Sequence, residues 1–171
     1  EFKDKTILIT GAGGSIGSEL SRQILNLQPK NLILLDNNEF SLFKISSELK
    51  HKCTYSLSDI RDKIKLDRIL KKFKPDFIFH TAALKHISFV EEDPYEAIKT
   101  NFLATVCLCQ LCIKHKVKKF VFISTDKAVY PSNIMGATKR LCEKYIQQIA
   151  KEELSTNFSI VRSGNVLGST G

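Results

Sequence analysis

Short apolar runs recur along this chain, and most are followed by a longer stretch that carries apolar residues at helical spacing. The runs are rich in Ile, Leu, Val and Phe and are bounded by Gly, Pro, Asn or Asp, which predicts buried strands. The predicted strands occupy residues 6–10, 31–36, 54–57, 77–79, 120–123 and 158–161. The predicted amphipathic helices occupy residues 15–27, 39–50, 62–73, 93–115 and 134–151.

Each predicted helix has an apolar stripe that should face a sheet. The stripes are Ile16, Leu20, Ile24 and Leu27; then Phe40, Phe43 and Leu49; then Ile64, Leu66, Ile69 and Leu70. Strands that are apolar on both faces and alternate with such helices indicate a parallel sheet covered on both sides. The sequence therefore predicts an α/β fold with a doubly wound parallel sheet, the Rossmann fold.

The length of 171 residues and the hydrophobic content of 43% suit one packed domain. No run approaches the apolar length that a bilayer-spanning helix requires, and Glu1-Phe2 does not begin a signal peptide. The chain ends in a turn-like stretch after Val166 with no closing element. We therefore expect residues 1–171 to be one domain of a longer protein, with sequence missing at both ends.

The net charge of +8 raises the question of a nucleic-acid partner. The basic residues are scattered among apolar positions, as on solvated helix faces, and no aromatic track accompanies them, so no nucleic-acid partner is expected. A basic field also suits a diphosphate substrate or an anionic membrane surface. The odd number of cysteines, five, favours a reducing, cytoplasmic setting. Cys107, Cys109, Cys112 and His115 are interpreted as packing residues, so no metal site is expected.

A glycine-rich loop joins the first predicted strand to the first predicted helix. Gly11 permits the sharp turn, Gly14 lets the backbone approach a pyrophosphate, and Gly17 lets the helix pack close to the sheet. Ser15 and Ile16 open the helix, whose free N–H groups and positive end favour phosphate. This loop predicts a dinucleotide-binding site.

Further cofactor contacts are expected where the next strands end. Asp36 ends the second strand, where its carboxylate accepts the ribose hydroxyls and repels a 2′-phosphate, so NAD is favoured over NADP. Asn37 follows it. Asp59 and Ile60 follow the third strand, where Asp59 would accept the adenine amino group. The small residues Thr81, Ala82 and Ala83 leave room for the cofactor after the fourth strand.

Four segments carry a resemblance to a known family: residues 10–17, 80–86, 124–128 and 133–140. They resemble the extended short-chain dehydrogenase/reductases and, more narrowly, the UDP-N-acetylglucosamine 4,6-dehydratases. The likeness is greatest to the C5-retaining, methionine-containing subgroup that feeds bacillosamine and other surface-glycan synthesis. An ordinary member uses a Tyr-x-x-x-Lys pair, whereas this chain has Met135 four positions before Lys139. A thioether cannot carry a proton, so other groups must do so.

The resemblance implies a redox-neutral reaction in which NAD oxidises C4 of the sugar, water leaves across C5–C6, and the hydride returns to C6. Lys127 would be the C5 base and would need a depressed pKa. Asp126 would protonate the leaving hydroxyl and would need a raised pKa. Thr125 would bond the C4 oxygen, Lys139 would hold the nicotinamide ribose, and Met135 would pack near the sugar.

The same resemblance implies that residues 1–171 are the NAD-binding domain of a longer protein, with the C-terminal substrate region largely missing, and it implies further contacts and partners. Lys85 would serve both cofactor and substrate, and His86, Asn101 and Asn165 would contact the UDP-sugar, while His80 is expected to be structural. Helices near 94–115 and 135–151 would pair subunits in a homo-oligomer, and the full-length protein could be tethered to the inner membrane. Two other functions stay open: a nucleotide-sugar 4-epimerase, which would need the tyrosine that Met135 replaces, and a catalytically silent dinucleotide-binding sensor or scaffold.

Overall fold

The computed structural model describes residues 2–50, 52–166 and 168, and its centre is a six-stranded sheet. All paired strands run parallel, in the order β3-β2-β1-β4-β5-β6. This is the doubly wound order that the alternating pattern predicts, and its direction reverses between β1 and β4. The strands are β1 (Thr6–Thr10), β2 (Asn31–Asp36), β3 (Thr54–Leu57), β4 (Phe77–His80), β5 (Lys119–Thr125) and β6 (Asn157–Ser163).

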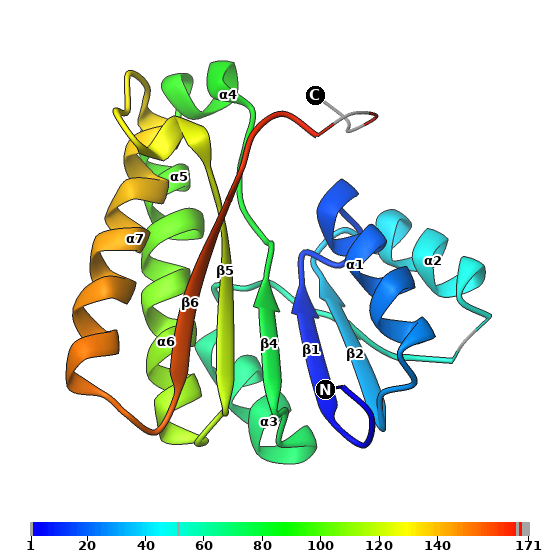
Figure 1. Cartoon of the computed structure of the whole chain (residues 1–171). Coiled ribbons are helices and arrows are strands. Elements are labelled where there is room, and N and C mark those ends of the chain that lie inside the picture. Colours follow the sequence, from blue (N-terminus) through cyan, green and yellow to red (C-terminus); the bar gives the residue numbers. More distant parts are fainter. Residues whose placement is uncertain (1, 51, 167, 169–171) are drawn as a thin grey trace.

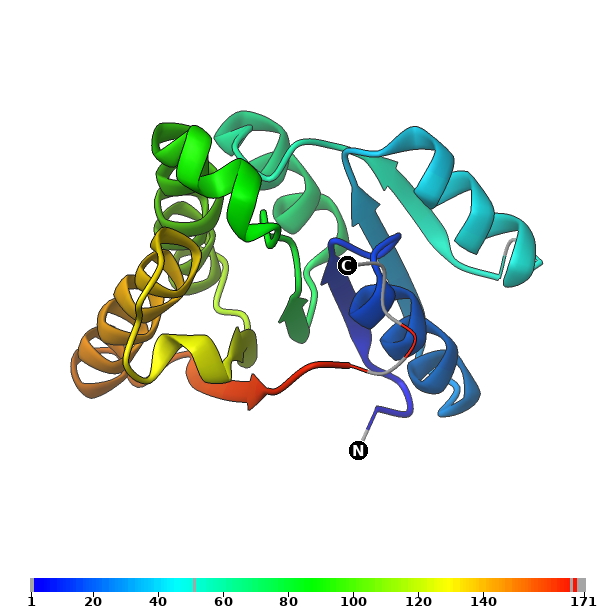
Figure 2. The same ribbon diagram turned by 90° about the horizontal axis from the view of Figure 1, so that it is seen from above.

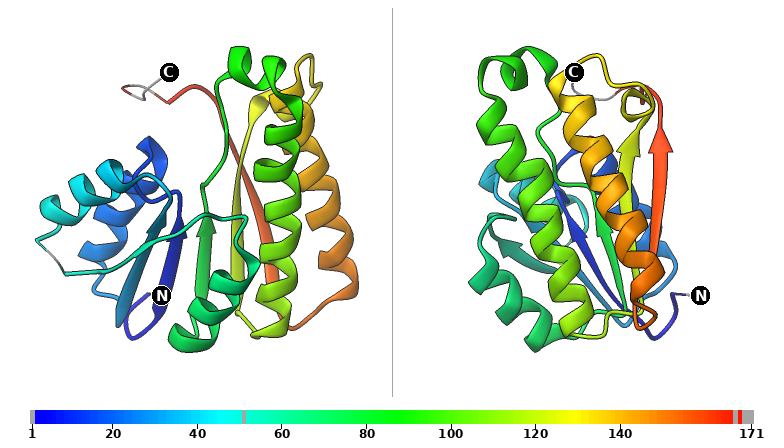
Figure 3. Two further views of the ribbon diagram at one scale, coloured as in Figure 1. Left: turned by 180° about the vertical axis from the view of Figure 1, so that it is seen from behind. Right: turned by 90° about the vertical axis from the view of Figure 1, so that its left-hand side faces the viewer.

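Helices cover both faces of the sheet (Figures 1 and 3). The first two helices pack on one face beside β1 and β2, and three others pack on the opposite face. They are α1 (Ser15–Asn26), α2 (Glu39–Glu48), α3 (Lys63–Phe73), α6 (Ala104–Lys114) and α7 (Ile134–Glu152). Short segments complete the chain: α4 (Ile87–Glu92), α5 (Pro94–Ala97), the π-helix η1 (Ile98–Leu103) and the 3₁₀ helix η2 (Asp126–Ala128).

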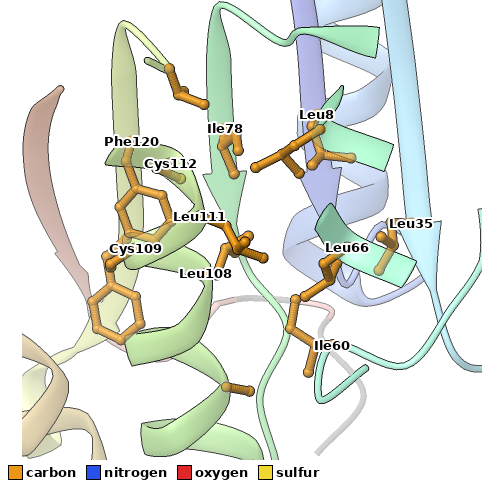
Figure 4. Packing of buried hydrophobic residues seen from close by; sticks show 14 of the residues in the cluster. Leu8, Leu35, Ile60, Leu66, Ile78, Leu108, Cys109, Leu111, Cys112 and Phe120 are labelled. Atoms are coloured by element: carbon orange, nitrogen blue, oxygen red, sulfur yellow. The ribbon is translucent and has the colours of Figure 1, made fainter. Parts of the chain in front are cut away.

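The larger core, which contains the most buried residues, lies between the sheet and α3, α6 and α7 (Figure 4). Leu8 and Ile78 project from the sheet onto Leu66 and Leu108 of the helices, and all four are fully buried. Fully burying one such side chain contributes about 1.5–3 kcal/mol relative to leaving it in water. This packing fixes the strands whose upper ends carry the site.

The predicted apolar stripe of α2 is confirmed at Leu49 and wrong at Phe40 and Phe43. Phe40 and Phe43 are 76% and 66% exposed, whereas Leu42, Ile45 and Leu49 face the sheet. Both sets follow helical spacing, so periodicity alone could not decide between them. The aliphatic set is the one that packs against β1 and β2.

The predicted helix 93–115 is confirmed as a continuous helical segment, Pro94–Lys114, in which the π-helix η1 separates α5 from α6. Contrary to the expectation from sequence, Pro94–Lys114 is long and apolar enough to cross a membrane by length and composition. Its residues Asn101, Thr105 and Leu108 are nevertheless buried against the protein interior, so the segment serves as a core helix here.

The cysteines confirm the packing interpretation. Cys109, Cys112 and Cys142 are buried in the larger core as free thiols, and Cys107 is half-buried. Burial raises the pKa of Cys109 and Cys112, which keeps both thiols protonated. No group of three His, Cys, Asp or Glu side chains within residues 2–50, 52–166 and 168 is placed to hold a metal ion.

Candidate active site

The glycine loop packs against the end of β4, at the point where the strand order reverses. Gly11 has a φ of +67°, and a Cβ there would lie 2.6 Å from the Ala82 nitrogen. A Cβ at Gly17 would lie 2.1 Å from the Gly11 carbonyl oxygen. Both positions exclude any larger residue. The N-terminus of α1 therefore lies close to the carboxyl edge of the sheet, the side of the molecule that faces the viewer in Figure 2. No side chain caps this helix end at Gly14, so its positive potential faces the loop.

Gly13 is a member of this loop that sequence reasoning missed. Its N–H donates to Asp36 Oδ2 over 2.8 Å, and Asp36 Oδ1 accepts from the Asn38 N–H over 2.9 Å. A Cβ at Gly13 would meet Ser41 Cβ at 2.5 Å. The loop thus fixes the orientation of the Asp36 carboxylate. The sequence did contain a signal for this role of Gly13. An extra glycine beside Gly14 indicates that a side chain at position 13 would clash with a neighbouring element, here Ser41.

The other predicted cofactor residues lie after β2, β3 and β4, and they range from buried to exposed. The Asp59 carboxylate is bound by the Arg61 guanidinium, with Nη2 at 2.6 Å from Oδ2, and hydrogen bonds from Arg61 lower the pKa of Asp59. Ile60 is buried in the larger core, while Asn37 is exposed. Ala83 follows Ala82 in the half-buried stretch after β4. The sequence analysis did not identify Arg61 as the partner of Asp59, although the two residues lie only two positions apart in the sequence.

The Thr125-Asp126-Lys127 segment forms a turn at the end of β5. The Thr125 hydroxyl donates to Asp126 Oδ1 over 2.9 Å, and Lys127 Nζ lies 3.3 Å from the same oxygen. Lys127 Nζ also donates to Asn165 Oδ1 over 3.0 Å. The structure therefore brings together four of the predicted residues. The bonds from Thr125 and Lys127 lower the pKa of Asp126, so the carboxyl is ionised in the resting chain, opposite to the raised value expected for an acid.

Lys139 lies beneath this turn, and its side chain is almost fully buried at 7% exposure. Its Nζ donates to the Ile123 carbonyl over 2.9 Å and sits 4.5 Å from the centre of the Phe122 ring. Burial lowers the pKa of Lys139 to about 8.

Met135 occupies an apolar cluster with Val90 and Ala97, and it is also buried. The next residue, Gly136, allows α7 to begin against the turn formed by Thr125, Asp126 and Lys127, because a Cβ there would lie 2.4 Å from the Lys127 carbonyl oxygen. The position that holds a tyrosine in ordinary dehydrogenases is therefore filled by aliphatic packing. No proton donor replaces the phenol at this point of α7.

Asn101 is turned inward rather than toward a ligand. It is 1% exposed, its amide group donates to the Leu84 carbonyl and to the Thr138 hydroxyl, and its Oδ1 accepts from the Leu84 N–H. Both amide hydrogens are used, so these contacts give Asn101 a structural role and correct the expected substrate contact. It ties the loop after β4 to α7. Lys85 and His86 are the last two residues of that loop and are exposed, with the His86 ring 6.2 Å from that of Phe89.

His80 is structural, as expected. Its Nδ1 lies 2.7 Å from the Thr10 hydroxyl and its Nε2 lies 2.9 Å from that of Thr105. Burial, assisted by the positive charge of Lys139, lowers the pKa of His80 to about 3. The ring is therefore neutral at physiological pH and joins β1, β4 and α6.

A buried carboxylate supports the turn from below, and sequence reasoning did not find it. Glu143 accepts from Ser124 Oγ at 2.8 Å and from Arg162 Nε at 2.8 Å, with Arg140 Nη1 at 3.1 Å. Burial alone would raise the pKa of Glu143, but the bonds from Arg162, Ser124 and Arg140 outweigh it and lower the pKa. The network ties α7 to the ends of β5 and β6.

Known proteins resemble this chain over almost all of its length. It is 45% identical to a capsular polysaccharide biosynthesis protein from Staphylococcus aureus, covering 100% of this chain and 30% of that protein. It is 38% identical to an inverting UDP-N-acetylglucosamine 4,6-dehydratase from Campylobacter jejuni, covering 99% and 52%. It is 37% identical to a UDP-glucose 4-epimerase from Rickettsia bellii, covering 99% and 51%. The chain thus spans about half of these relatives or less.

Two solved structures show the same architecture. The X-ray structure of Pen from Bacillus thuringiensis matches with a TM-score of 0.93 at 38% identity, over 99% of this chain and 53% of that one. A UDP-glucose 4-epimerase from Thermus thermophilus, solved in complex with NAD, matches with a TM-score of 0.83 at 24% identity, over 92% and 54%. The second likeness establishes the fold. A family model described as polysaccharide biosynthesis protein matches residues 7–171, and the chain belongs to that family.

Proposed function

We propose that this chain is the NAD-binding domain of a longer UDP-N-acetylglucosamine 4,6-dehydratase. The observation that carries the proposal is the polar turn at the end of β5, where Asp126 and Lys127 stand side by side while Met135 is buried nearby. A dehydration needs an acid and a base in addition to a redox cofactor. The Campylobacter relative with that activity supports the assignment.

The glycine loop fits NAD. The contacts that a Cβ would make at Gly11, Gly13 and Gly17 show a backbone cradle with no room for side chains. Asp36 is held at the loop, where a carboxylate favours ribose hydroxyls over a 2′-phosphate. The Thermus epimerase of the same fold was solved with NAD. When bound, NAD would supply a hydride acceptor for sugar C4 and return that hydride to C6.

The low pKa of Asp126 fits a role in which the carboxylate first accepts a proton. In this scheme the Thr125 hydroxyl turns from Asp126 to the C4 oxygen, and the C4 hydroxyl proton passes to the Asp126 carboxylate as C4 is oxidised. The carboxyl is then protonated and can give that proton to the C6 hydroxyl, which leaves as water. Asp126 thus ends each cycle ionised, as it begins.

Lys127 would act on the other proton. Its Nζ reaches the same side of the turn as Asp126 and is held by Asn165 Oδ1. A neutral Lys127 amine would remove the C5 proton, which the adjacent ketone acidifies, and would return a proton to C5 after the hydride reaches C6. Lys139, buried beneath the turn, would hold the cofactor ribose and add positive charge near the site.

The test uses a protein that extends this chain to the length of its relatives, and it compares the wild type with Lys127→Ala. Each is incubated with UDP-N-acetylglucosamine, and mass spectrometry identifies the product. The wild type should give a product that has lost one water, and the variant should lose this turnover while binding NAD unchanged. A matched control is Lys144→Ala, an exposed lysine on α7. Wild-type turnover in the Lys127 variant would remove the base assignment.

A 4-epimerase is the second candidate, because the Rickettsia relative bears that name at 37% identity. An epimerase inverts C4 without eliminating water, so its product has the mass of the substrate. Met135 disfavours this function since it cannot serve as the phenolic acid and base. A silent sensor would bind NAD and give no product, so the same incubation separates all three functions.

A further inference from the structure

We propose that the amino-terminal edge of the sheet is a docking surface for an anionic lipid bilayer. We call this surface the lysine edge. It comprises the chain before β1 and the last helical turn and loop before each later strand, with the first residue of each strand: residues 2–6, 23–31, 45–50, 52–54, 70–77, 111–119 and 149–157. The proposal does not depend on the dehydratase assignment, because it concerns the side of the molecule opposite the candidate active site.

The lysine edge carries nearly all of the chain's net charge. Its described residues include five acids: Asp4, Glu48, Asp76, Glu152 and Glu153. They include thirteen lysines: Lys3, Lys5, Lys30, Lys50, Lys52, Lys71, Lys72, Lys74, Lys114, Lys116, Lys118, Lys119 and Lys151. The excess of eight positive charges equals the formal net charge of the whole chain, +8, so the remainder of the molecule is close to neutral.

The lysines span most of the width of the sheet. A lysine stands within three residues before each of five strands: Lys5, Lys30, Lys52, Lys74 and Lys118 precede β1 to β5 in turn. Because the strands are parallel, all five lie at one edge (Figure 1). Neighbouring strands are about 5 Å apart, so these positions extend over roughly 20 Å. That breadth suits an extended anionic surface better than one small phosphate compound.

Five described non-glycine residues of this edge have a left-handed backbone, and three of them are lysines; the other two are Asp4 and Gln28. Lys50, Lys74 and Lys116 each follow a helix and have φ values of 51°, 46° and 53°. Helices commonly end in this left-handed conformation, but with glycine there, because a Cβ is strained. At these three places the chain carries a cation where backbone geometry favours glycine.

Two features fit a membrane surface in particular. Leu27 and Leu154 project from the same edge and are 52% and 91% exposed, so apolar side chains stand among the lysines. Phe2 packs on Phe77 at this end of the sheet, with ring centres 5.2 Å apart. Any segment before residue 1 would therefore join here. Docking through this edge leaves the glycine loop and the turn at Lys127 facing away from the bilayer.

Nucleic acid is the less favoured partner. The described residues of the lysine edge contain no arginine and no exposed aromatic ring. Base and phosphate recognition commonly uses the bidentate arginine fork and aromatic stacking. Lysine clusters act as point charges that attract anionic headgroups.

The test is co-sedimentation of the 171-residue chain with two kinds of vesicle: phosphatidylcholine alone, and equal parts phosphatidylcholine and phosphatidylglycerol. The edge variant replaces three exposed lysines, Lys30→Glu, Lys52→Glu and Lys71→Glu. The matched control reverses the same number of charges on α2 and α3, through Lys44→Glu, Lys63→Glu and Arg68→Glu. Circular dichroism checks that both variants fold.

The wild type should bind the anionic vesicles and not the neutral ones. The edge variant should lose about tenfold or more in affinity, whereas the control should stay within about twofold. Equal loss in both variants would show a response to net charge alone and overturn the proposal. So would absence of binding to anionic vesicles, or displacement of the wild type from them by a short duplex DNA at equal phosphate concentration.

Discussion

The buried ammonium of Lys139 should reduce the stability of this fold near neutral pH, and Lys139→Met tests this. Burial lowers the pKa of Lys139 from its ordinary value of 10.5 to about 8. A pKa difference of one between the folded and unfolded chain corresponds to about 1.4 kcal/mol, so the charged form costs about 3 kcal/mol. Replacing the ammonium by a thioether also removes the hydrogen bond to the Ile123 carbonyl, a loss of about 1 kcal/mol. The net gain expected at pH 7 is about 2 kcal/mol.

The sign of this effect should change with pH. Below about pH 8 the lysine is protonated in both the folded and the unfolded chain, so the full burial cost is present. Between about 8 and 10.5 only the unfolded chain holds the proton, so the free energy of unfolding of the wild type rises with pH. Near pH 10.5 the cost is gone, and the methionine variant should be the less stable by about 1 kcal/mol.

Urea unfolding followed by circular dichroism at pH 7 and near pH 10.5 measures both values. Lys144→Met, at an exposed position of α7, is the control and should change stability by less than about 0.5 kcal/mol at either pH. A Lys139→Met variant that is less stable at pH 7 would refute the reasoning. It would mean that the Ile123 carbonyl and the Phe122 ring stabilise the ammonium by more than its burial costs.

Three further substitutions probe the site. Gly17→Ala should lower the free energy of unfolding by about 3 kcal/mol or more and abolish NAD binding, because its Cβ would meet the Gly11 carbonyl at 2.1 Å. Calorimetry measures the binding, and a near-normal affinity for NAD would contradict the proposed role of the glycine loop. Asp36→Ala should weaken the preference for NAD over NADP, and unchanged discrimination would remove that assignment. Glu143→Gln should lower the free energy of unfolding in urea by about 1–2 kcal/mol, because the charge-assisted hydrogen bonds from Arg162, Ser124 and Arg140 weaken while the exposed Arg162 side chain can still be solvated. A change below about 0.5 kcal/mol would show that the ion pair is not needed.

Much of the fold could be predicted because its signals are local. The apolar runs from Thr6 and Asn31 indicate strands whatever surrounds them, and Gly11 and Gly17 mark a turn that only glycine fits. The π-helix η1 could not be predicted, since its residue Asn101 bonds to Leu84 and Thr138, which lie far away in sequence. The exposure of Phe40 likewise depends on which face of α2 finds the sheet.

The candidate site shows the same division. Thr125, Asp126 and Lys127 are adjacent in sequence, so one strand end places them together. The supporting carboxylate of Glu143 had no such signal, because its partner Arg162 lies 19 residues away on another element. The direction of the pKa of Asp126 also escaped prediction, because it is set by how the Thr125 hydroxyl is oriented.

The most direct test of the dehydratase account is the reaction of the protein, at the length of its relatives, with UDP-N-acetylglucosamine in heavy water. The account predicts a product that has lost one water and carries one solvent deuterium at C5, delivered by Lys127, while the hydrogen from C4 appears at C6. Mass spectrometry and proton NMR read both positions, and the NMR couplings also report whether C5 is retained or inverted. A product of unchanged mass that differs from the substrate at C4 would contradict the account.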